Sequence, residues 1–282
     1  MLYPVKKEFA LIGSSPSQSP SPLIHRELGK VKGIDVSYRL LSITGEALPA
    51  LFESKLKQLD GFNVTMPHKT AIMPLLDDVS PRAARCGAVN TVGFFNGRSV
   101  GANTDCEGFV RAARAAHIAI DGSVMIAGCG GVARAFACEC LDAGASVTLA
   151  VRESSTAKAQ ALQRELKDKT GRPVALTSLT EAAGAYDLLI NATPMGMAPL
   201  LNASPFSPAL VKQAEAVFDA VYYPLKTRLL QDAAAAGTAY VNGLPMLVWQ
   251  AAAAEELWCA TVYTEEEVSR VTALAEKELK AR

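Results

Sequence analysis

The second half of the chain alternates short apolar runs, rich in β-branched residues, with longer Ala-rich stretches of helical periodicity. The apolar runs have the length and composition of buried β-strands and cover residues 123–127, 146–151, 186–191 and 216–222. The helical stretches cover residues 131–143, 156–169 and 225–236. Gly144 and Gly237 follow two of these stretches, at the position of a left-handed helix C-cap. Such alternation predicts βαβ units that share a parallel sheet.

The first hundred residues also alternate strand and helix patterns, with strand-like runs at residues 9–12, 36–43 and 61–65. Two further runs, residues 89–95 and 98–103, flank Asn96-Gly97, the strongest short-range signal for a two-residue β-hairpin. We therefore expect an antiparallel strand pair at the edge of a first sheet, which marks a separate α/β domain.

From Pro245 onward the pattern is helical throughout. An isolated helical tail has to bury its apolar face, so this tail either closes the second domain or returns to the first. A chain of 282 residues suggests two domains or one large one, and the two strand patterns favour two.

Charge excludes several classes of partner. The 28 Lys and Arg residues balance 28 Asp and Glu residues, so no basic field is present to hold a nucleic-acid backbone or an anionic membrane. Every apolar run is shorter than the roughly 18 residues that a membrane span needs. We therefore expect no nucleic-acid partner and no membrane partner.

The six cysteines show no CxxC spacing and have few histidine partners, which favours reduced, buried thiols over a zinc site. We expect no metal. The first ten residues carry Lys6, Lys7 and Glu8 and lack the pattern of a secretory signal, which predicts a cytoplasmic protein.

The strongest generic sign of chemistry is a strand that runs into glycines and then into a helix. Residues 124–134 read Val-Met-Ile-Ala-Gly-Cys-Gly-Gly-Val-Ala-Arg. Glycines permit a tight turn and a close approach of the backbone, and the helix N-terminus faces a pyrophosphate. With Ala133 in the third small position, this is a dinucleotide-binding fingerprint.

The end of the next strand normally distinguishes NADP from NAD. The strand at residues 147–151 is followed by Arg152 and Glu153. A guanidinium pairs with a 2′-phosphate through two hydrogen bonds, which favours NADP. A carboxylate facing the ribose would instead accept hydrogen bonds from the free hydroxyls of NAD, so both cofactors stay open.

Polar residues also cluster at strand ends in the first domain. The segment 61–69 delivers Lys69 to the end of a strand, where open α/β sheets bind ligands. His68 beside it has no evident orienting partner, which favours a structural role. A lysine and an aspartate at adjacent strand ends, beside a nicotinamide site, would supply the proton transfer that carbonyl reduction needs.

Several motifs together give the chain a resemblance to the shikimate dehydrogenase family over nearly its whole length. The matching segments are Ser19-Pro-Ser-Pro-Leu-Ile-His25, Asn63-Val-Thr-Met-Pro-His-Lys69, Gly87-Ala-Val-Asn-Thr91, Asn103-Thr-Asp105, Gly128-Cys-Gly-Gly-Val-Ala-Arg-Ala135, Asn191-Ala-Thr-Pro-Met-Gly-Met197, Asp219-Ala-Val-Tyr-Tyr-Pro224 and Met246-Leu-Val-Trp-Gln-Ala251.

This resemblance implies a fold, an activity and a set of site residues. It implies a substrate-binding domain with a mixed sheet, residues 1–105 and 244–282, and a Rossmann-type NAD(P)-binding domain, residues 106–243. The implied reaction is the reversible NADPH-dependent reduction of 3-dehydroshikimate to shikimate, in aromatic amino acid biosynthesis, by a monomer or homodimer. Lys69 and Asp105 are the implied catalytic residues. The implied substrate-binding residues are Ser19, Ser21, Thr65, Asn90, Tyr222 and Gln250. The implied cofactor-binding residues are Gly128, Gly130, Gly131, Val132, Ala133, Arg152, Thr193, Met197 and Gly243.

The chain departs from the family pattern at Gln18, at Arg26, at residues 151–153 and at Glu255, where an aromatic residue is common. The last two departures bear on cofactor choice and on the pocket around Gln250. The alternatives are therefore a quinate or quinate/shikimate dehydrogenase using NAD, a diverged paralogue, and a nucleotide-binding sensor of the same fold. Hydroxyls at both Ser19 and Ser21 favour shikimate.

Overall fold

The structure is a computed structural model that describes residues 6–16 and 19–281. Its contacts divide the chain into two compact units. Unit 1 comprises the described residues of Met1–Gly108 and Val248–Arg282, and unit 2 comprises Phe109–Leu247. The C-terminal helices therefore return to the first unit, and the two-domain α/β fold predicted from the sequence is confirmed.

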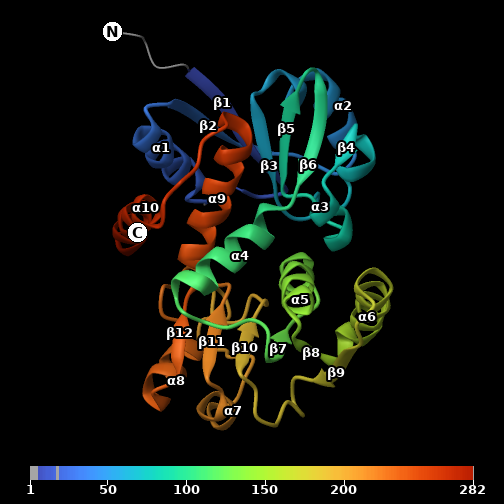
Figure 1. The fold of residues 1–282 in the computed structure, drawn as a ribbon, viewed down its shortest axis with the longest axis vertical. Coiled ribbons are helices and arrows are strands. Elements are labelled where there is room, and N and C mark those ends of the chain that lie inside the picture. Colours follow the sequence, from blue (N-terminus) through green and yellow to red (C-terminus); the bar gives the residue numbers. More distant parts are fainter. Residues whose placement is uncertain (1–5, 17–18, 282) are drawn as a thin grey trace. The chain divides into compact units, whose positions relative to one another are not determined.

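Unit 1 is built on a six-stranded mixed sheet (Figure 1). Its strands are β1 (Lys6–Gly13), β2 (Asp35–Ser42), β3 (Gly61–Val64), β4 (Asp78–Val79), β5 (Thr91–Phe95) and β6 (Arg98–Ala102). They lie in the order β2-β1-β3-β5-β6-β4. Strands β1, β2 and β3 are parallel, β5 runs antiparallel to β3 and β6, and β4 is parallel to β6.

The helices of unit 1 are α1 (Ser21–Lys32), α2 (Leu48–Ser54), α3 (Pro81–Cys86) and α10 (Glu265–Lys280), with short 3-10 turns η1 (Leu56–Gln58) and η2 (Met73–Leu75). Two longer helices, α4 (Thr104–Ala115) and α9 (Gly243–Cys259), begin in one unit and end in the other. None of the helices in the described part of the chain is long and apolar enough to cross a membrane.

Unit 2 is built on a six-stranded sheet in which every neighbouring pair is parallel. Its strands are β7 (Ser123–Ala127), β8 (Ser146–Val151), β9 (Val174–Ser178), β10 (Leu188–Asn191), β11 (Ala216–Asp219) and β12 (Ala239–Val241). The order β12-β11-β10-β7-β8-β9 is that of a doubly wound dinucleotide-binding fold, and it reverses direction between β7 and β10.

The helices of unit 2 are α5 (Gly131–Ala143), α6 (Thr156–Thr170), α7 (Pro208–Gln213) and α8 (Arg228–Ala236), with a 3-10 turn η3 (Glu153–Ser155). Because crossovers between parallel strands are right-handed, α5 and α6 cover one face of the sheet and α8 covers the other. Three aromatic rings, Phe109 of α4, Phe136 of α5 and Phe218 of β11, pack on one another in tilted and edge-on contacts.

Two details of the predicted elements are wrong. The C-terminal tail is not helical throughout, because α9 ends at Cys259 and Ala260 adopts a positive φ of 50°. Thr264 and Glu267 then form a capping box that begins α10. The hairpin of β5 and β6 is present, with positive φ at Asn96 and Gly97, but it is not the edge of the sheet. The two-residue strand β4 lies outside it and is too short to show a sequence pattern.

The start of β3 is fixed by a close contact with α9. The Trp258 indole stacks on Phe9 at 4.3 Å between ring centroids and donates its N–H to the Val92 carbonyl at 3.0 Å. A Cβ atom on Gly61 would lie 2.3 Å from the Trp258 Nε1 atom. A glycine is therefore required at residue 61, because the indole occupies the side-chain position.

We expect Gly61→Ala to lower the free energy of unfolding by about 1–3 kcal/mol, because the new methyl group displaces a packed indole. Urea denaturation of the full chain measures this. Gly45→Ala is the matched control, since a Cβ there meets no atom within 4 Å. Equal effects of the two substitutions would contradict the role assigned to the Trp258 contact.

Candidate active site

The register of the unit 1 sheet brings four polar loops to one edge. The chain leaves β1 after Gly13 and β3 after Val64 at the same edge, because these strands are parallel. Strand β5 runs the other way, so its start lies there, and the Val64 N–H donates to the Asn90 carbonyl at 2.8 Å. Strand β6 ends at Ala102, paired with Thr91, at the same edge. The segments around residues 19–21, 65–69, 90 and 103–105 therefore converge.

Lys69 and Asp105 meet at this edge. The Lys69 Nζ atom lies 2.5 Å from Oδ2 of Asp105, and the two side chains are 14% and 13% exposed. The Lys69 carbonyl accepts from the Val89 N–H at 2.9 Å, which fixes the backbone of the lysine. His68 points the other way, buried, with Nε2 3.0 Å from the Ile43 carbonyl. An ammonium and a carboxylate are thus held together at the border between protein and solvent.

Asn90 is held in a buried network of neutral groups. Its Oδ1 accepts from the N–H of Thr104 at 2.7 Å and from the Thr91 hydroxyl at 3.0 Å. Its Nδ2 donates to the Thr104 hydroxyl at 3.1 Å. An amide carries two N–H groups, so one further donor of Nδ2 is available to a ligand. Asn63 donates to the Asn90 carbonyl at 3.2 Å, which ties the end of β3 to this network.

Ser19 and Ser21 lie at the N-terminus of α1. The Ser19 hydroxyl donates to the Ser21 hydroxyl at 2.9 Å and accepts from the Ser21 N–H at 3.2 Å. Two adjacent hydroxyls at the positive end of a helix form a favourable place for an anion. The Thr65 methyl group packs tightly on Gly13, at the end of β1, where a Cβ atom would lie 2.4 Å from it. Gln250, the remaining predicted substrate residue of this unit, is buried on α9.

In unit 2 the glycine-rich turn connects β7 to α5. Gly128 has a φ of 109°, and a Cβ atom there would meet the Ala192 carbonyl at 3.0 Å. Around Gly130, the N-cap of α5, a Cβ atom would meet nothing within 4 Å. The turn thus lies against β10 on one side and is open at the helix N-terminus on the other. Gly131, Val132 and Ala133 form the first turn of α5 behind it. This open backbone cradle fits a dinucleotide pyrophosphate.

Arg152 follows β8, at the same carboxyl edge of the sheet as the glycine turn. Its side chain is exposed and forms no ion pair with any residue of the described chain. Glu153 is exposed as well. Arg134 of α5, in contrast, is bound to Glu165 of α6, whose pKa is lowered by hydrogen bonds from Arg134 and Lys169 against an opposing effect of burial. Arg152 is therefore open to an anionic ligand, while Arg134 links two helices.

The remaining predicted cofactor residues lie on loops after β10 and β12. The Thr193 hydroxyl donates to Asn191 Oδ1 at 2.7 Å, and Met197 is 42% exposed on the same loop. Gly243 donates its N–H to the Val221 carbonyl at 3.0 Å, one residue before Tyr222. A Cβ on Gly243 would lie 2.2 Å from the Ala220 carbonyl, so the loops after β11 and β12 touch backbone to backbone.

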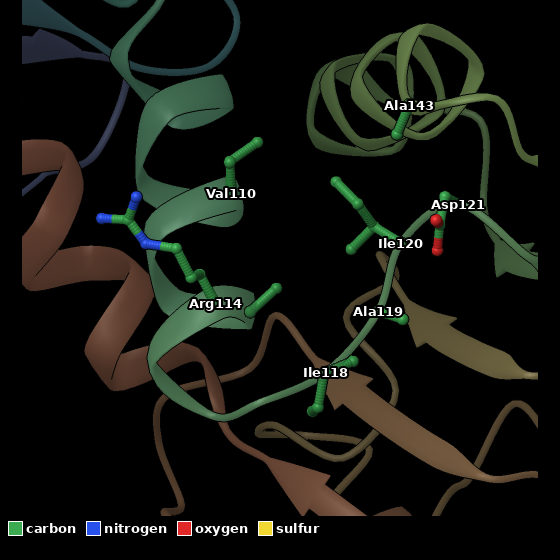
Figure 2. Close-up of a pocket in the computed structure, with 8 residues that line it drawn as sticks. Val110, Arg114, Ile118, Ala119, Ile120, Asp121 and Ala143 are labelled. Atoms are coloured by element: carbon green, nitrogen blue, oxygen red, sulfur yellow. The ribbon is translucent and has the colours of Figure 1, made fainter.

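One cavity of unit 2 is separate from these residues. Figure 2 shows the side chains around it, which come from α4, from the segment leading into β7 and from the end of α5. It has a volume of about 370 Å³ and is mostly apolar, with Arg114 and Asp121 among its lining residues. Its lining residue Ala143 ends α5, about 18 Å along the helix from Gly131. The cavity therefore does not belong to the cradle at the glycine turn.

Comparison with known proteins gives the family. A family model described as the shikimate dehydrogenase substrate binding domain matches residues 11–92. A relative from Bacillus cytotoxicus named shikimate dehydrogenase (NADP(+)) is 36% identical over 258 residues, 90% of this chain and 93% of the relative. The chain belongs to the shikimate dehydrogenase family.

Solved structures of this family have the same fold as the chain. Shikimate 5-dehydrogenase from Thermus thermophilus, in complex with NADP(H) and shikimate, is 35% identical. It aligns with a TM-score of 0.85 over 95% of this chain and 99% of that chain. Quinate dehydrogenase from Corynebacterium glutamicum, in complex with NAD, is 32% identical with a TM-score of 0.85 over 95% and 98%. Both kinds of enzyme therefore occur among structures this similar to the chain.

One departure from the family pattern, Glu255, is a buried carboxylate. Its side chain is fully buried on α9, with Oε1 3.0 Å from His25 Nδ1 and Oε2 2.5 Å from the Tyr263 hydroxyl. Burial and the nearby Glu255 raise the pKa of Tyr263 well above its ordinary value. The His25 ring stacks on Tyr38 at 4.2 Å, and the Tyr38 hydroxyl donates to Asn63 Oδ1 at 2.7 Å. Glu255 thus holds the His25 ring and the Tyr263 hydroxyl in place. The sequence missed this role, although a glutamate after four alanines in an apolar helix was a signal for a buried partner.

Two further departures from the family pattern are Arg26 and Gln18. Arg26 is exposed on α1, with Nε 3.7 Å from Glu27. Gln18 lies outside the described residues.

Asp219 is the family-motif residue that the sequence did not place in the site. It ends β11 and is completely buried. Burial raises its pKa to about 6, against the lowering effect of hydrogen bonds from Thr227, Val221 and Asn191. The signal that could have found it is its position, because an acidic residue directly after a buried parallel strand lies at the ligand-binding edge.

The raised pKa of Asp219 predicts a pH effect on stability. The unfolded chain loses this proton near the ordinary pKa of 3.8 and the folded chain near 6, so unfolding becomes easier as the pH rises through that window. A difference of roughly two pKa units corresponds to about 3 kcal/mol. We expect the free energy of unfolding of the wild type to fall by up to this amount, relative to Asp219→Asn, between pH 4 and pH 7. Urea denaturation across this range measures it, and parallel curves for the two proteins would contradict the raised pKa.

Proposed function

We propose that this protein is a shikimate dehydrogenase that reversibly reduces 3-dehydroshikimate to shikimate with NADPH. The observation that carries the proposal is the Lys69–Asp105 pair at 2.5 Å, on the sheet edge where the loop of Ser19 and Ser21 also emerges. The relatives named shikimate dehydrogenase support it. We further propose a cytoplasmic enzyme that acts as a monomer or homodimer.

Lys69 supplies the proton in this proposal. A bound NADPH supplies the hydride, and a ketone that accepts a hydride develops negative charge on its oxygen. The Lys69 ammonium, a point charge with three donors, stabilises that charge and donates the proton that completes the alcohol. In the oxidation direction the neutral amine accepts the proton.

Asp105 orients Lys69. Its Oδ2 atom holds the lysine Nζ, while the carboxylate retains acceptor capacity for a substrate hydroxyl. Because both side chains are largely buried, the ion pair is less screened than one on the open surface. The lysine therefore points in one direction before substrate arrives, which reduces the ordering needed at the reacting oxygen.

Ser19 and Ser21 bind the substrate carboxylate. Their hydroxyls are neutral donors at the N-terminus of α1, where the helix dipole also favours an anion. Thr65, Asn90, Tyr222 and Gln250 bind the remaining carboxylate and hydroxyl oxygens. This division leaves full charges near the reacting oxygen and neutral groups at the carboxylate.

Unit 2 holds the cofactor. Gly128, Gly130, Gly131, Val132 and Ala133 form the pyrophosphate cradle, and Thr193, Met197 and Gly243 lie on the loops beside it. We assign the exposed Arg152 guanidinium to the 2′-phosphate of NADP, because Arg152 has no carboxylate partner among the described residues.

Quinate oxidation with NAD is the second candidate. The similarity to quinate dehydrogenase from Corynebacterium glutamicum, solved with NAD, favours it, as does the exposed Glu153 beside Arg152. Serine at residue 21 favours shikimate, because a larger residue at this position is the change associated with quinate use in the family pattern.

We expect Lys69→Ala to lower kcat for shikimate oxidation by about 10²–10⁴-fold, because general acid–base catalysis is lost. Shikimate binding should change little, since the carboxylate and hydroxyl contacts remain, and calorimetry measures it. Lys57→Ala, which removes an exposed lysine paired with Glu53, is the matched control and should keep the wild-type rate. Unchanged turnover in Lys69→Ala would overturn the mechanism.

Initial rates of oxidation of shikimate and quinate, each with NADP and NAD, decide between the two candidates. We expect the highest kcat/KM for shikimate with NADP and a loss of the NADP preference in Arg152→Ala. A higher kcat/KM for quinate with NAD would establish the second candidate. If none of the four assays shows turnover, the protein is instead a paralogue that acts on another substrate or a nucleotide-binding sensor of the same fold.

A further inference from the structure

Asp219 accepts three hydrogen bonds inside unit 2, and the mechanism above gives it no part. Its Oδ1 atom accepts from Asn191 Nδ2 at 2.9 Å and from the Val221 N–H at 3.0 Å. Its Oδ2 atom accepts from the Thr227 hydroxyl at 2.6 Å. The donors come from the end of β10, from the loop after β11 and from the N-cap of α8. One buried carboxylate therefore joins three separate segments.

The Asn191 branch extends through the loop after β10. The same Nδ2 that reaches Asp219 also donates to the Met195 carbonyl at 2.9 Å. On its other side, Asn191 Oδ1 accepts from the N–H and hydroxyl of Thr193 at 3.0 and 2.7 Å. The Thr193 hydroxyl accepts in turn from the Met195 N–H at 3.1 Å. The orientation of the Asn191 amide thus sets the loop that carries Thr193 and Met197.

The other two branches fix the neighbouring loop. The Thr227 hydroxyl, besides donating to Asp219, accepts from the Leu230 N–H at 3.3 Å and caps α8. Its methyl group packs on Gly196, where a Cβ would be 2.9 Å away. Val221 receives the Gly243 N–H on its carbonyl while its own N–H is held by Asp219. The segment with Tyr222 and the start of α9 are thereby attached to the same carboxylate.

We propose that Asp219 is a positioning residue for the cofactor: it holds the loops of Thr193, Met197, Tyr222 and Gly243 in the shape that binds NADP(H). This inference rests on the proposed function, because it concerns the same cofactor. Asp219 is fully buried, so it acts through these loops without touching the ligand.

The charge of Asp219 matters because all three partners donate to it. A carboxylate accepts four hydrogen bonds, whereas a protonated acid carries an O–H that needs an acceptor of its own. The groups facing it from β10, α8 and its own loop are an amide, a hydroxyl and a backbone N–H, and all are neutral. Because burial raises the pKa of Asp219 to about 6, mild acid protonates Asp219 and disrupts the three hydrogen bonds that it accepts. Cofactor affinity should therefore weaken below about pH 6.

The test compares NADPH dissociation constants of Asp219→Asn and of the wild type, measured by nucleotide fluorescence without substrate. The amide introduced by Asp219→Asn would place a further N–H among donors, so we expect at least tenfold weaker binding at pH 7.5 and an unchanged affinity for shikimate. At pH 5.5, half a unit below that pKa, about three quarters of the wild-type carboxylate is protonated, so the difference should shrink to about a quarter to a third of its value at pH 7.5. The 2′-phosphate also titrates near pH 6, but it does so equally for both proteins.

Asp187→Asn is the matched control. Asp187 also accepts hydrogen bonds from a hydroxyl and a backbone N–H, those of Ser123, at the opposite, amino end of the sheet. It should bind NADPH within twofold of the wild type. Equal losses in both variants would mean that any lost sheet carboxylate weakens binding, and would overturn the inference.

A second pair of variants covers the case in which Asp219→Asn does not fold. Thr227→Ser keeps the hydroxyl that reaches Asp219 and should retain NADPH affinity, whereas Thr227→Val removes it and should weaken binding severalfold. Equal affinity of these two would refute the positioning role. A wild type that binds neither NADPH nor NADH would instead refute the proposed function, so the two failures are distinguishable.

Discussion

The direction of the strands decides where every functional group of this protein lies. In unit 1, three parallel strands and an antiparallel hairpin end or begin at one edge, so the loops after β1, β3 and β6 and before β5 meet there. In unit 2, six parallel strands end at one edge, and the order reverses between β7 and β10. Each sheet thus turns segments far apart in sequence into neighbours. These loops carry the charged side chains and the hydrogen-bond donors of the candidate site.

Buried polar groups hold these loops in place. Glu255 supports His25, His25 stacks on Tyr38, and the Tyr38 hydroxyl fixes the Asn63 amide against the segment of Asn90. In unit 2, the buried Asp219 holds loops together in the same way, through hydrogen bonds from Asn191, Val221 and Thr227. A buried charge is unfavourable unless it is hydrogen-bonded, so such residues contribute less to stability than to the choice of one loop conformation. The pKa of Asp219 is raised because the cost of burying its charge exceeds the stabilisation that its hydrogen bonds give to the charged form.

The family is shared by enzymes that differ in substrate and cofactor, and the chain departs from the family pattern at few positions near the site. Glu255 is hydrogen-bonded to His25 and Tyr263. In the function proposed above, the two serines bear on the choice between shikimate and quinate, and Arg152 and Glu153 bear on the choice of cofactor.

Local sequence signals predicted the fold class and most of the described strands, because apolar periodicity, the Asn96-Gly97 turn and the helix-capping glycines act over a few residues. The motifs at strand ends also indicated the residues of the candidate site without coordinates. The same signals did not reveal β4, whose two residues have no periodicity, or the break at Ala260 between two helices.

The contacts that matter most for function follow from tertiary packing alone. Lys69 touches Asp105, Glu255 pairs with His25, and Asp219 joins three loops. Lys69 and Asp105 are 36 residues apart in the chain, His25 and Glu255 are 230 apart, and Asn191 and Asp219 are 28 apart. Strand register and burial bring them together, and no local pattern encodes either.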